Sequence, residues 1–250
     1  MSKATILQQP FRTYNGGKSG NGTFQNIISQ VSKCNIFIDA MAGNGGIASH
    51  ISNAGIIVIN DIDTGIVSKW KDLIDKNNTG HPGKIILENL DYWDLIVKYD
   101  IARSETVFFY FDPPYLLSTR KSKKPLYKYE WSEADHKQFL SLAPTVKSNC
   151  MISAYENDLY NKMLKGWNKY FFKSQTRNGQ RIECLYMNYE QSNILQDFSH
   201  VGKDYLDRQR LKRKISRWLN KLKQLPPLER TMIINSIINE YKKDSIDLLQ

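Results

Sequence analysis

Four consecutive residues, Asp112-Pro113-Pro114-Tyr115, combine an acid, two prolines and an aromatic ring directly after an apolar run. That run, Val107 to Phe111, predicts a buried strand, so the four residues leave a sheet at a strand end. The prolines have no N–H to donate, but their carbonyl oxygens can still accept hydrogen bonds. Together these groups can hold an exocyclic amine and stack against its base. An ordinary turn is the alternative, and the coincidence of all these features favours a functional site.

A second motif lies in the small-residue segment Asp39 to Gly46. Small residues let the backbone turn sharply and approach a ligand closely. The spacing is not the dinucleotide pattern G-x-G-x-x-G, because Ala48 stands three residues after Gly45, and the leading carboxylate would repel a pyrophosphate. Asp61 ends the next predicted strand, where an acid can accept hydrogen bonds from ribose hydroxyls. This pattern fits S-adenosylmethionine better than NAD, and a plain tight turn is the alternative.

A repeating order of strands and helices has to position these motifs. Apolar, β-rich runs occur at 36–38, 56–59, 84–87, 107–111 and 151–152. Helix-like segments alternate with them, at 22–33, 63–78, 91–103, 132–147 and 156–166. Strands that alternate with helices predict right-handed crossovers and a mostly parallel sheet. Two further strand-like segments, 169–176 and 181–189, flank Asn178-Gly179, which predicts an antiparallel hairpin and therefore a mixed sheet.

The net charge of +10 is concentrated in two segments of the 250 residues. Residues 203–223 hold nine basic and two acidic side chains, and residues 116–130 hold five basic side chains and one acidic. Such segments favour a polyanionic partner, because neutralising phosphates releases counterions, while a solvated surface is the alternative. The 41% hydrophobic and 24% charged residues exclude a disordered or collagen-like chain.

Residues 199–250 differ in character from the α/β part and predict a basic helical extension. One apolar stripe at helical spacing consists of Leu211, Ile215, Trp218, Leu222 and Leu225. Pro226-Pro227 ends that helix and begins another, whose stripe consists of Ile233, Ile234, Ile237, Ile238 and Tyr241.

Several classes of protein are not indicated. No apolar run approaches membrane-spanning length, and no secretory signal is visible at the N-terminus. The cysteines Cys34, Cys150 and Cys184 are odd in number and lack partners at metal-ligand spacing. We therefore expect a cytoplasmic protein with no metal, no membrane contact and no disulfide framework.

Taken together, the motifs over about residues 10–190 resemble the Dam-type, alpha-group N6-adenine-specific DNA methyltransferases. Tyr14-Asn15-Gly16-Gly17-Lys18 is similar to the family's methionine-pocket motif, and Asp112 to Tyr115 matches its catalytic motif. Asp39 to Gly45 is similar to the glycine-rich cofactor loop, Asp61 to the ribose-binding acid, and Leu90-Asp91 falls where the family contacts the cofactor adenine. Ser153-Ala154-Tyr155 and Glu183 to Tyr189 also resemble family segments.

The resemblance implies a methyltransferase catalytic domain over residues 1–190, with a Rossmann-like, S-adenosylmethionine-dependent α/β core. The implied reaction moves a methyl group from S-adenosylmethionine to adenine N6 in DNA, with base flipping. The implied catalytic residues are Asp112, Pro113, Pro114 and Tyr115. The implied cofactor-binding residues are Tyr14, Lys18, Asp39, Ala42, Gly43, Asn44, Gly45, Asp61, Asp91 and Asp112. The alternatives are the same chemistry on RNA, or a non-catalytic DNA-binding protein that retains the fold.

The chain departs from the family in length. Only 21 steps separate Asp91 from Asp112, where Dam-type enzymes usually insert a target-recognition domain. Recognition would then be relaxed, or would come from other basic segments or from a separate partner, with a restriction endonuclease as a possible companion. The predicted DNA contacts are Arg120, Lys121, Lys123, Lys124, Arg177, Arg181, Arg210, Lys212, Arg213 and Lys214. The sequence indicates neither the recognition site nor the oligomeric state.

Overall fold

A mixed seven-stranded sheet forms the centre of the first of two units into which the chain divides. The computed structural model describes residues 7–11, 14–20, 22–76, 83–100, 106–121, 124–176 and 179–241. The first unit is Met1–Phe198 and the second is Ser199–Gln250.

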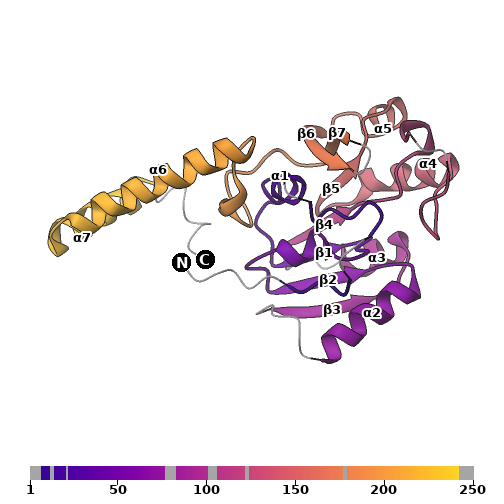
Figure 1. The fold of residues 1–250 in the computed structure, drawn as a ribbon, viewed down its shortest axis with the longest axis horizontal. Helices are drawn as coiled ribbons and strands as arrows, with labels where there is room; N and C mark the ends of the chain where they lie inside the picture. Colours follow the sequence, from indigo (N-terminus) through magenta and orange to yellow (C-terminus); the bar gives the residue numbers. More distant parts are fainter. Residues whose placement is uncertain are drawn as a thin grey trace. The chain divides into compact units, whose positions relative to one another are not determined.

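The sheet has the order β3-β2-β1-β4-β5-β7-β6, and the first five of these strands follow one another across Figure 1 in that order. The strands are β1 (Ile36–Asp39), β2 (Ile56–Asn60), β3 (Lys84–Glu88), β4 (Val107–Phe111), β5 (Asn149–Ala154), β6 (Asn168–Thr176) and β7 (Gly179–Met187). Strands β1 to β5 pair in parallel, and β7 pairs antiparallel with both β5 and β6. The predicted Rossmann-like sheet, mostly parallel with a terminal hairpin, is confirmed.

The described residues of this unit form five α-helices. Helix α1 (Thr23–Ile28) precedes β1, and the other four lie between strands: α2 (Thr64–Asp75), α3 (Tyr92–Tyr99), α4 (Glu133–Leu142) and α5 (Asp158–Met163). Side-chain caps set where several of them begin. The Asp63 carboxylate accepts from the N–H of Gly65, and Asn157 accepts from the N–H of Tyr160. The prediction of one helix through residue 147 was wrong, because Pro144 lies in a short 3-10 turn after α4 and has no N–H to continue it.

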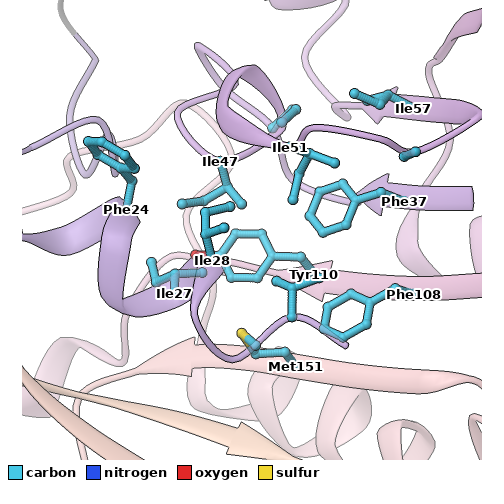
Figure 2. Close-up of a cluster of buried hydrophobic side chains, with 14 of the residues drawn as sticks. Phe24, Ile27, Ile28, Phe37, Ile47, Ile51, Ile57, Phe108, Tyr110 and Met151 are labelled. Atoms are coloured by element: carbon cyan, nitrogen blue, oxygen red, sulfur yellow. The ribbon is translucent and has the colours of Figure 1, made fainter. Parts of the chain in front are cut away.

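Strand β4 is buried along its whole length because both faces of the sheet are covered. Phe108 and Tyr110 pack in one cluster with residues of α1 and β1, including Ile27 and Phe37, as Figure 2 shows. Phe109 and Phe111 join the opposite cluster, which contains Phe139 of α4. Because successive side chains of β4 pack into opposite clusters, the strand is held between the two layers of the core. The position at which Asp112 leaves the sheet is fixed with it.

Strand β1 lies between β2 and β4, so the strand order reverses beside it. Asp39, the last residue of β1, pairs in register with Tyr110 of β4, two residues before Asp112. Ligands of open α/β sheets bind at the carboxyl ends of the strands at such a reversal. The topology therefore brings the two sequence motifs to one edge of the sheet.

The second unit contains α6 (Tyr205–Gln224) and α7 (Pro227–Glu240), with Asp204 capping the start of α6. Pro226 and Pro227 separate the helices, as expected from their restricted backbone. Many apolar side chains of both helices are exposed, including Trp218 at 59% and Ile237 at 49%. In the described part of the chain, no helix combines the length and apolarity needed to cross a bilayer.

Candidate active site

A cavity of about 340 Å³ opens at the carboxyl ends of β1, β2 and β4. Most of the predicted cofactor-binding residues line it: Tyr14, Lys18, Asp39, Ala42, Asn44, Asp61, Asp91 and Asp112. Pro114 also lines it, whereas Gly43, Gly45, Pro113 and Tyr115 are not among the lining residues. The strand-end motifs of the sequence therefore converge on one pocket.

Gly43 and Gly45 lie in the turn after β1, between residues that line the pocket. Gly43 and Gly45 have φ values of 52° and 68°, a region that other residues rarely adopt. A Cβ on Gly45 would overlap the Trp70 indole, and one on Gly43 would overlap the Tyr14 ring. Trp70 Nε1 donates to the carbonyl of Gly43 at 3.0 Å, which fixes the turn. The turn thus needs glycine for both its backbone conformation and its close packing.

The carboxylates of Asp39 and Asp61 are buried against the pocket and hold backbone groups. Asp61 Oδ2 accepts from the N–H of Gly43 at 2.8 Å, and Asp39 Oδ2 accepts from the N–H of Ala48 at 3.2 Å. Burial raises the pKa of Asp39 to about 7, with the Asp112 and Asp61 charges adding to the effect and the Ala48 hydrogen bond opposing it. A cationic ligand beside Asp39 would favour its ionised form.

Lys18 and Asp112 form an ion pair inside the pocket. The ammonium lies 2.7 Å from Asp112 Oδ2, and their side chains are only 8% and 17% exposed. Lys18 Nζ also donates to the carbonyl of Gly16 at 3.0 Å. Burial raises the pKa of Asp112 to about 6, although Lys18 opposes the shift. Burial lowers the pKa of Lys18, but the carboxylates of Asp112 and Glu183 outweigh it, so the net shift is upward.

The two carboxylate oxygens of Asp112 differ in their hydrogen bonds. Oδ1 is buried and has no hydrogen-bond partner within the ranges that the structure describes. A buried acceptor without a partner costs about 1–3 kcal/mol, so such atoms point to a ligand that supplies the donor. Because Lys18 already donates to Oδ2, Oδ1 is the oxygen that can accept a hydrogen bond from a ligand.

Tyr115 is anchored by two residues to which the sequence analysis gave no role in the reaction. Its hydroxyl donates to Glu183 Oε2 at 2.8 Å and lies 3.2 Å from Ser153 Oγ. The ring packs edge-on against Tyr155 at a centroid distance of 4.7 Å, and Lys18 Nζ lies 4.8 Å from the ring centroid. Glu183 is 68 positions from Tyr115 in the chain. No local spacing signals this contact, because it depends on how β7 pairs with β5.

The segment after the catalytic motif folds over the pocket and contributes lining residues that were not predicted to bind the cofactor. These residues are Tyr127, Lys128, Tyr129, Glu130, Trp131 and Asp135. Lys128 Nζ pairs with Asp63 Oδ1 at 3.0 Å, and Asn15 Nδ2 donates to the Leu126 carbonyl at 3.4 Å. In the sequence this segment resembles a basic loop, but Leu126 and Lys128 hold it to residues that line the pocket.

Arg120, one of the predicted DNA contacts, is paired within the protein. Its guanidinium forms two hydrogen bonds with the Glu130 carboxylate, at 3.0 and 2.6 Å, and the residue is only 7% exposed. A bidentate pair of this kind uses the charge internally and leaves little for a phosphate. Arg120 therefore braces the loop.

The other predicted DNA contacts differ in their surroundings. Lys121, Lys124, Lys212, Arg213 and Lys214 are exposed, and Arg210 is exposed but pairs with Asp207 at 2.8 Å. The guanidinium of Arg181 lies over the Tyr155 ring, 5.6 Å from its centroid. Lys123 and Arg177 lie outside the described residues. Among the residues described, no group of three His, Cys, Asp or Glu side chains is arranged to hold a metal ion.

Comparison with solved structures gives several likenesses at low identity. A candidate rRNA methylase from Clostridium thermocellum is 18% identical with a TM-score of 0.42, over 67% of this chain and 98% of that one. A candidate methyltransferase from Streptococcus mutans in complex with SAH is 16% identical with a TM-score of 0.43, over 65% and 94%. TrmN from Thermus thermophilus is 12% identical with a TM-score of 0.44, over 66% and 46%.

The family comparison concerns the segment with the catalytic motif. No curated protein matches the chain at a significant level. Residues 86–181 match the family model of the D12 class N6 adenine-specific DNA methyltransferases. These residues include Asp112 to Tyr115, the loop that folds over the pocket, and strand β5. The resemblance expected from the motifs is therefore confirmed, and over this segment the chain is similar to the D12 class of N6 adenine-specific DNA methyltransferases.

Proposed function

We propose that this protein transfers a methyl group from S-adenosylmethionine to the exocyclic N6 amine of adenine in DNA. The observation that carries the proposal is the Oδ1 of Asp112, which is buried and has no hydrogen-bond partner among the described residues, in a pocket that Asp39 and Asp61 also line. Support for adenine and for DNA comes from the family match over residues 86–181. The two basic segments are consistent with a polyanionic substrate.

The hydrogen-bond acceptors of the pocket fit the proposed cofactor. The buried Asp39 carboxylate suits a cationic amine, and Asp61 sits at the end of β2, where a carboxylate can accept from ribose hydroxyls. A volume of about 340 Å³ falls within the range of small-molecule pockets. The glycine turn at Gly43 and Gly45 lets the backbone come close. The bound cofactor would supply an electrophilic methyl group on sulfur.

The protein's own residues would orient the amine and raise its nucleophilicity. Oδ1 of Asp112 would accept one N–H of the amine, and the Pro113 carbonyl would accept the other. These hydrogen bonds favour a more tetrahedral nitrogen, whose lone pair is less delocalised into the ring. After methyl transfer the nitrogen would carry one proton more than the neutral product, and the ionised Asp112 would accept that proton.

Tyr115 would provide the stacking surface for a base taken out of the duplex. Exposed basic residues would hold the phosphates, namely Lys121 and Lys124 in the first unit and Lys212, Arg213 and Lys214 in the second. We also place the reaction in a reducing cytoplasm, since Cys34, Cys150 and Cys184 are free and buried.

The test is methyl transfer from labelled S-adenosylmethionine to unmethylated genomic DNA and to total RNA, followed by nucleoside analysis. We expect N6-methyladenine in DNA, absent with Asp112→Ala. Label confined to RNA would overturn the DNA substrate and retain the chemistry. No label in either, with DNA binding retained by the wild type and by Asp112→Ala, would favour the non-catalytic alternative.

A further inference from the structure

We propose that Glu183 is a positioning residue that sets the Tyr115 ring for the target base, acting through the Tyr115 hydroxyl. The inference rests on the proposed function. Tyr115 donates to Glu183 Oε2 at 2.8 Å and has Ser153 Oγ at 3.2 Å. Since β5 pairs with β7, with Ala154 opposite Cys184, the two anchors come from neighbouring strands of the rigid sheet.

The burial of Glu183 indicates that its carboxylate does more than fill space. Glu183 is 5% exposed and Ser153 is 0% exposed. A buried carboxylate is costly unless its oxygens receive hydrogen bonds or an opposite charge. Within the described part of the chain, no basic group lies within 4.0 Å of the Glu183 carboxylate, and the Lys18 charge acts on it from farther away. Its hydrogen bond comes from the Tyr115 hydroxyl. An apolar residue would fill the same site at lower cost, so the carboxylate is placed where it can fix that hydroxyl.

The anchor restricts the movement of the ring. Lys18 Nζ lies 4.8 Å from the centroid of the Tyr115 ring, and Tyr155 packs edge-on at 4.7 Å. With the hydroxyl fixed as well, the side chain is held along its length before a substrate arrives. Preorganised groups lose less conformational freedom on binding. The consequence would be seen in the binding and orientation of the base more than in cofactor binding.

The experiment compares Glu183→Ala, Glu183→Gln, Tyr115→Phe and the double variant Tyr115→Phe/Glu183→Ala. We expect Glu183→Ala to raise the KM for DNA about tenfold, the scale of one base–aromatic stack. Glu183→Gln keeps an acceptor oxygen and should remain within about threefold of wild type. Affinity for S-adenosylmethionine should stay unchanged in all variants, and the exposed Glu190→Gln serves as the matched control.

Non-additivity separates positioning from general damage. If Glu183 acts through the hydroxyl, the double variant should be no worse than the more affected single variant. Fluorescence of 2-aminopurine at the target position should report reduced stacking in Glu183→Ala, Tyr115→Phe and the double variant, each measured well below its melting temperature. A KM at the wild-type level in Glu183→Ala, additive losses, or a parallel loss of cofactor binding would each overturn the inference. Failure of the proposed function would show differently, as a wild type that methylates no DNA.

Discussion

The Lys18 ammonium holds Oδ2 of Asp112 at 2.7 Å and leaves Oδ1 as a buried oxygen with no partner among the described residues. The two residues are 94 positions apart in the chain. The ion pair makes the two carboxylate oxygens different, because Oδ2 is paired with Lys18 and Oδ1 is available to accept a hydrogen bond. This asymmetry is what suits Asp112 to accept an N–H from an amine.

Removing Lys18 should therefore impair catalysis through Asp112. In Lys18→Met, burial would raise the Asp112 pKa further, so the carboxyl would be protonated at neutral pH and no longer accept from the amine. We expect kcat at neutral pH to fall on the order of 100-fold. Activity should recover partly as the pH rises from about 7 to about 9, because Asp112 then ionises. The measurement is a pH profile of methyl transfer.

The matched control for this variant is Lys98→Met. Lys98 also lies 2.7 Å from a carboxylate, that of Glu88, but its side chain is 51% exposed. Exposed pairs contribute roughly 0–1 kcal/mol, so this change should alter neither the rate nor its pH dependence. A Lys18→Met protein with a wild-type pH profile would contradict the role assigned to the ion pair.

Cofactor affinity should depend on the ionisation of Asp39. Its pKa of about 7 is above the ordinary value of 3.8, because burial disfavours the charged form. A cationic ligand requires the carboxylate, so Asp39 must release a proton on binding below pH 7. The dissociation constant should therefore rise as the pH falls, by at most tenfold per pH unit.

Calorimetry at pH 6 and pH 8 in buffers of different ionisation enthalpy measures this proton release. Asp39→Asn should bind S-adenosylmethionine more weakly and with little pH dependence. The exposed Asp72→Asn should behave as wild type. Equal affinity of the wild type at both pH values would argue against contact between Asp39 and the cationic group.

The glycine at position 45 should be required for folding as well as for binding. Gly45→Ala would place a methyl group on the Trp70 ring in a backbone conformation with φ 68°, so both overlap and strain act. We expect a loss of about 3 kcal/mol in the free energy of unfolding, measured in urea. Gly166→Ala has φ 90° and open space around its Cβ, so strain alone should cost about 1 kcal/mol. Similar losses in the two variants would show that the Trp70 contact is unimportant.

Arg120 should matter for stability and not for the electrostatics of DNA binding. Removing one partner of a buried pair leaves the other uncompensated, so Arg120→Ala should lower the free energy of unfolding by about 3 kcal/mol. Arg120→Met/Glu130→Leu should regain much of that loss. The salt dependence of DNA binding should not change, whereas Lys121→Ala should flatten it slightly. A clear drop in the salt slope with Arg120→Ala would restore Arg120 as a phosphate contact.

The contrast between Arg120 and Asp112 shows how far the sequence alone can be interpreted. Asp112 and Asp39 follow apolar strands, and parallel strands end at one edge of the sheet, so local patterns bring these residues together. Arg120 sits in a run of bases that resembles a solvated loop, and only the return of the chain to Glu130 buries it. A charge count contains no information about that return.

Glu183 illustrates the second limit. Its hydrogen bond to Tyr115 depends on the register between β5 and β7, and a shift of one residue would point the side chain to the other face of the sheet. The hairpin itself could be predicted from Asn178-Gly179, but the register could not. Helix ends were likewise set by single residues such as Pro144 in the 3-10 turn after α4.

The basic residues of α6 should carry part of the DNA affinity. Replacing Arg210, Lys212, Arg213 and Lys214 by Ala should weaken binding and reduce the slope of log K against log salt by up to about three, since each phosphate contact contributes about 0.9. Arg210 should contribute least, because it already pairs with Asp207 at 2.8 Å. The matched control removes four exposed lysines of the first unit, namely Lys71, Lys76, Lys162 and Lys165. Equal effects of the two sets would indicate a general charge effect, and an unchanged slope in the α6 variant would leave this helix without a role in DNA binding.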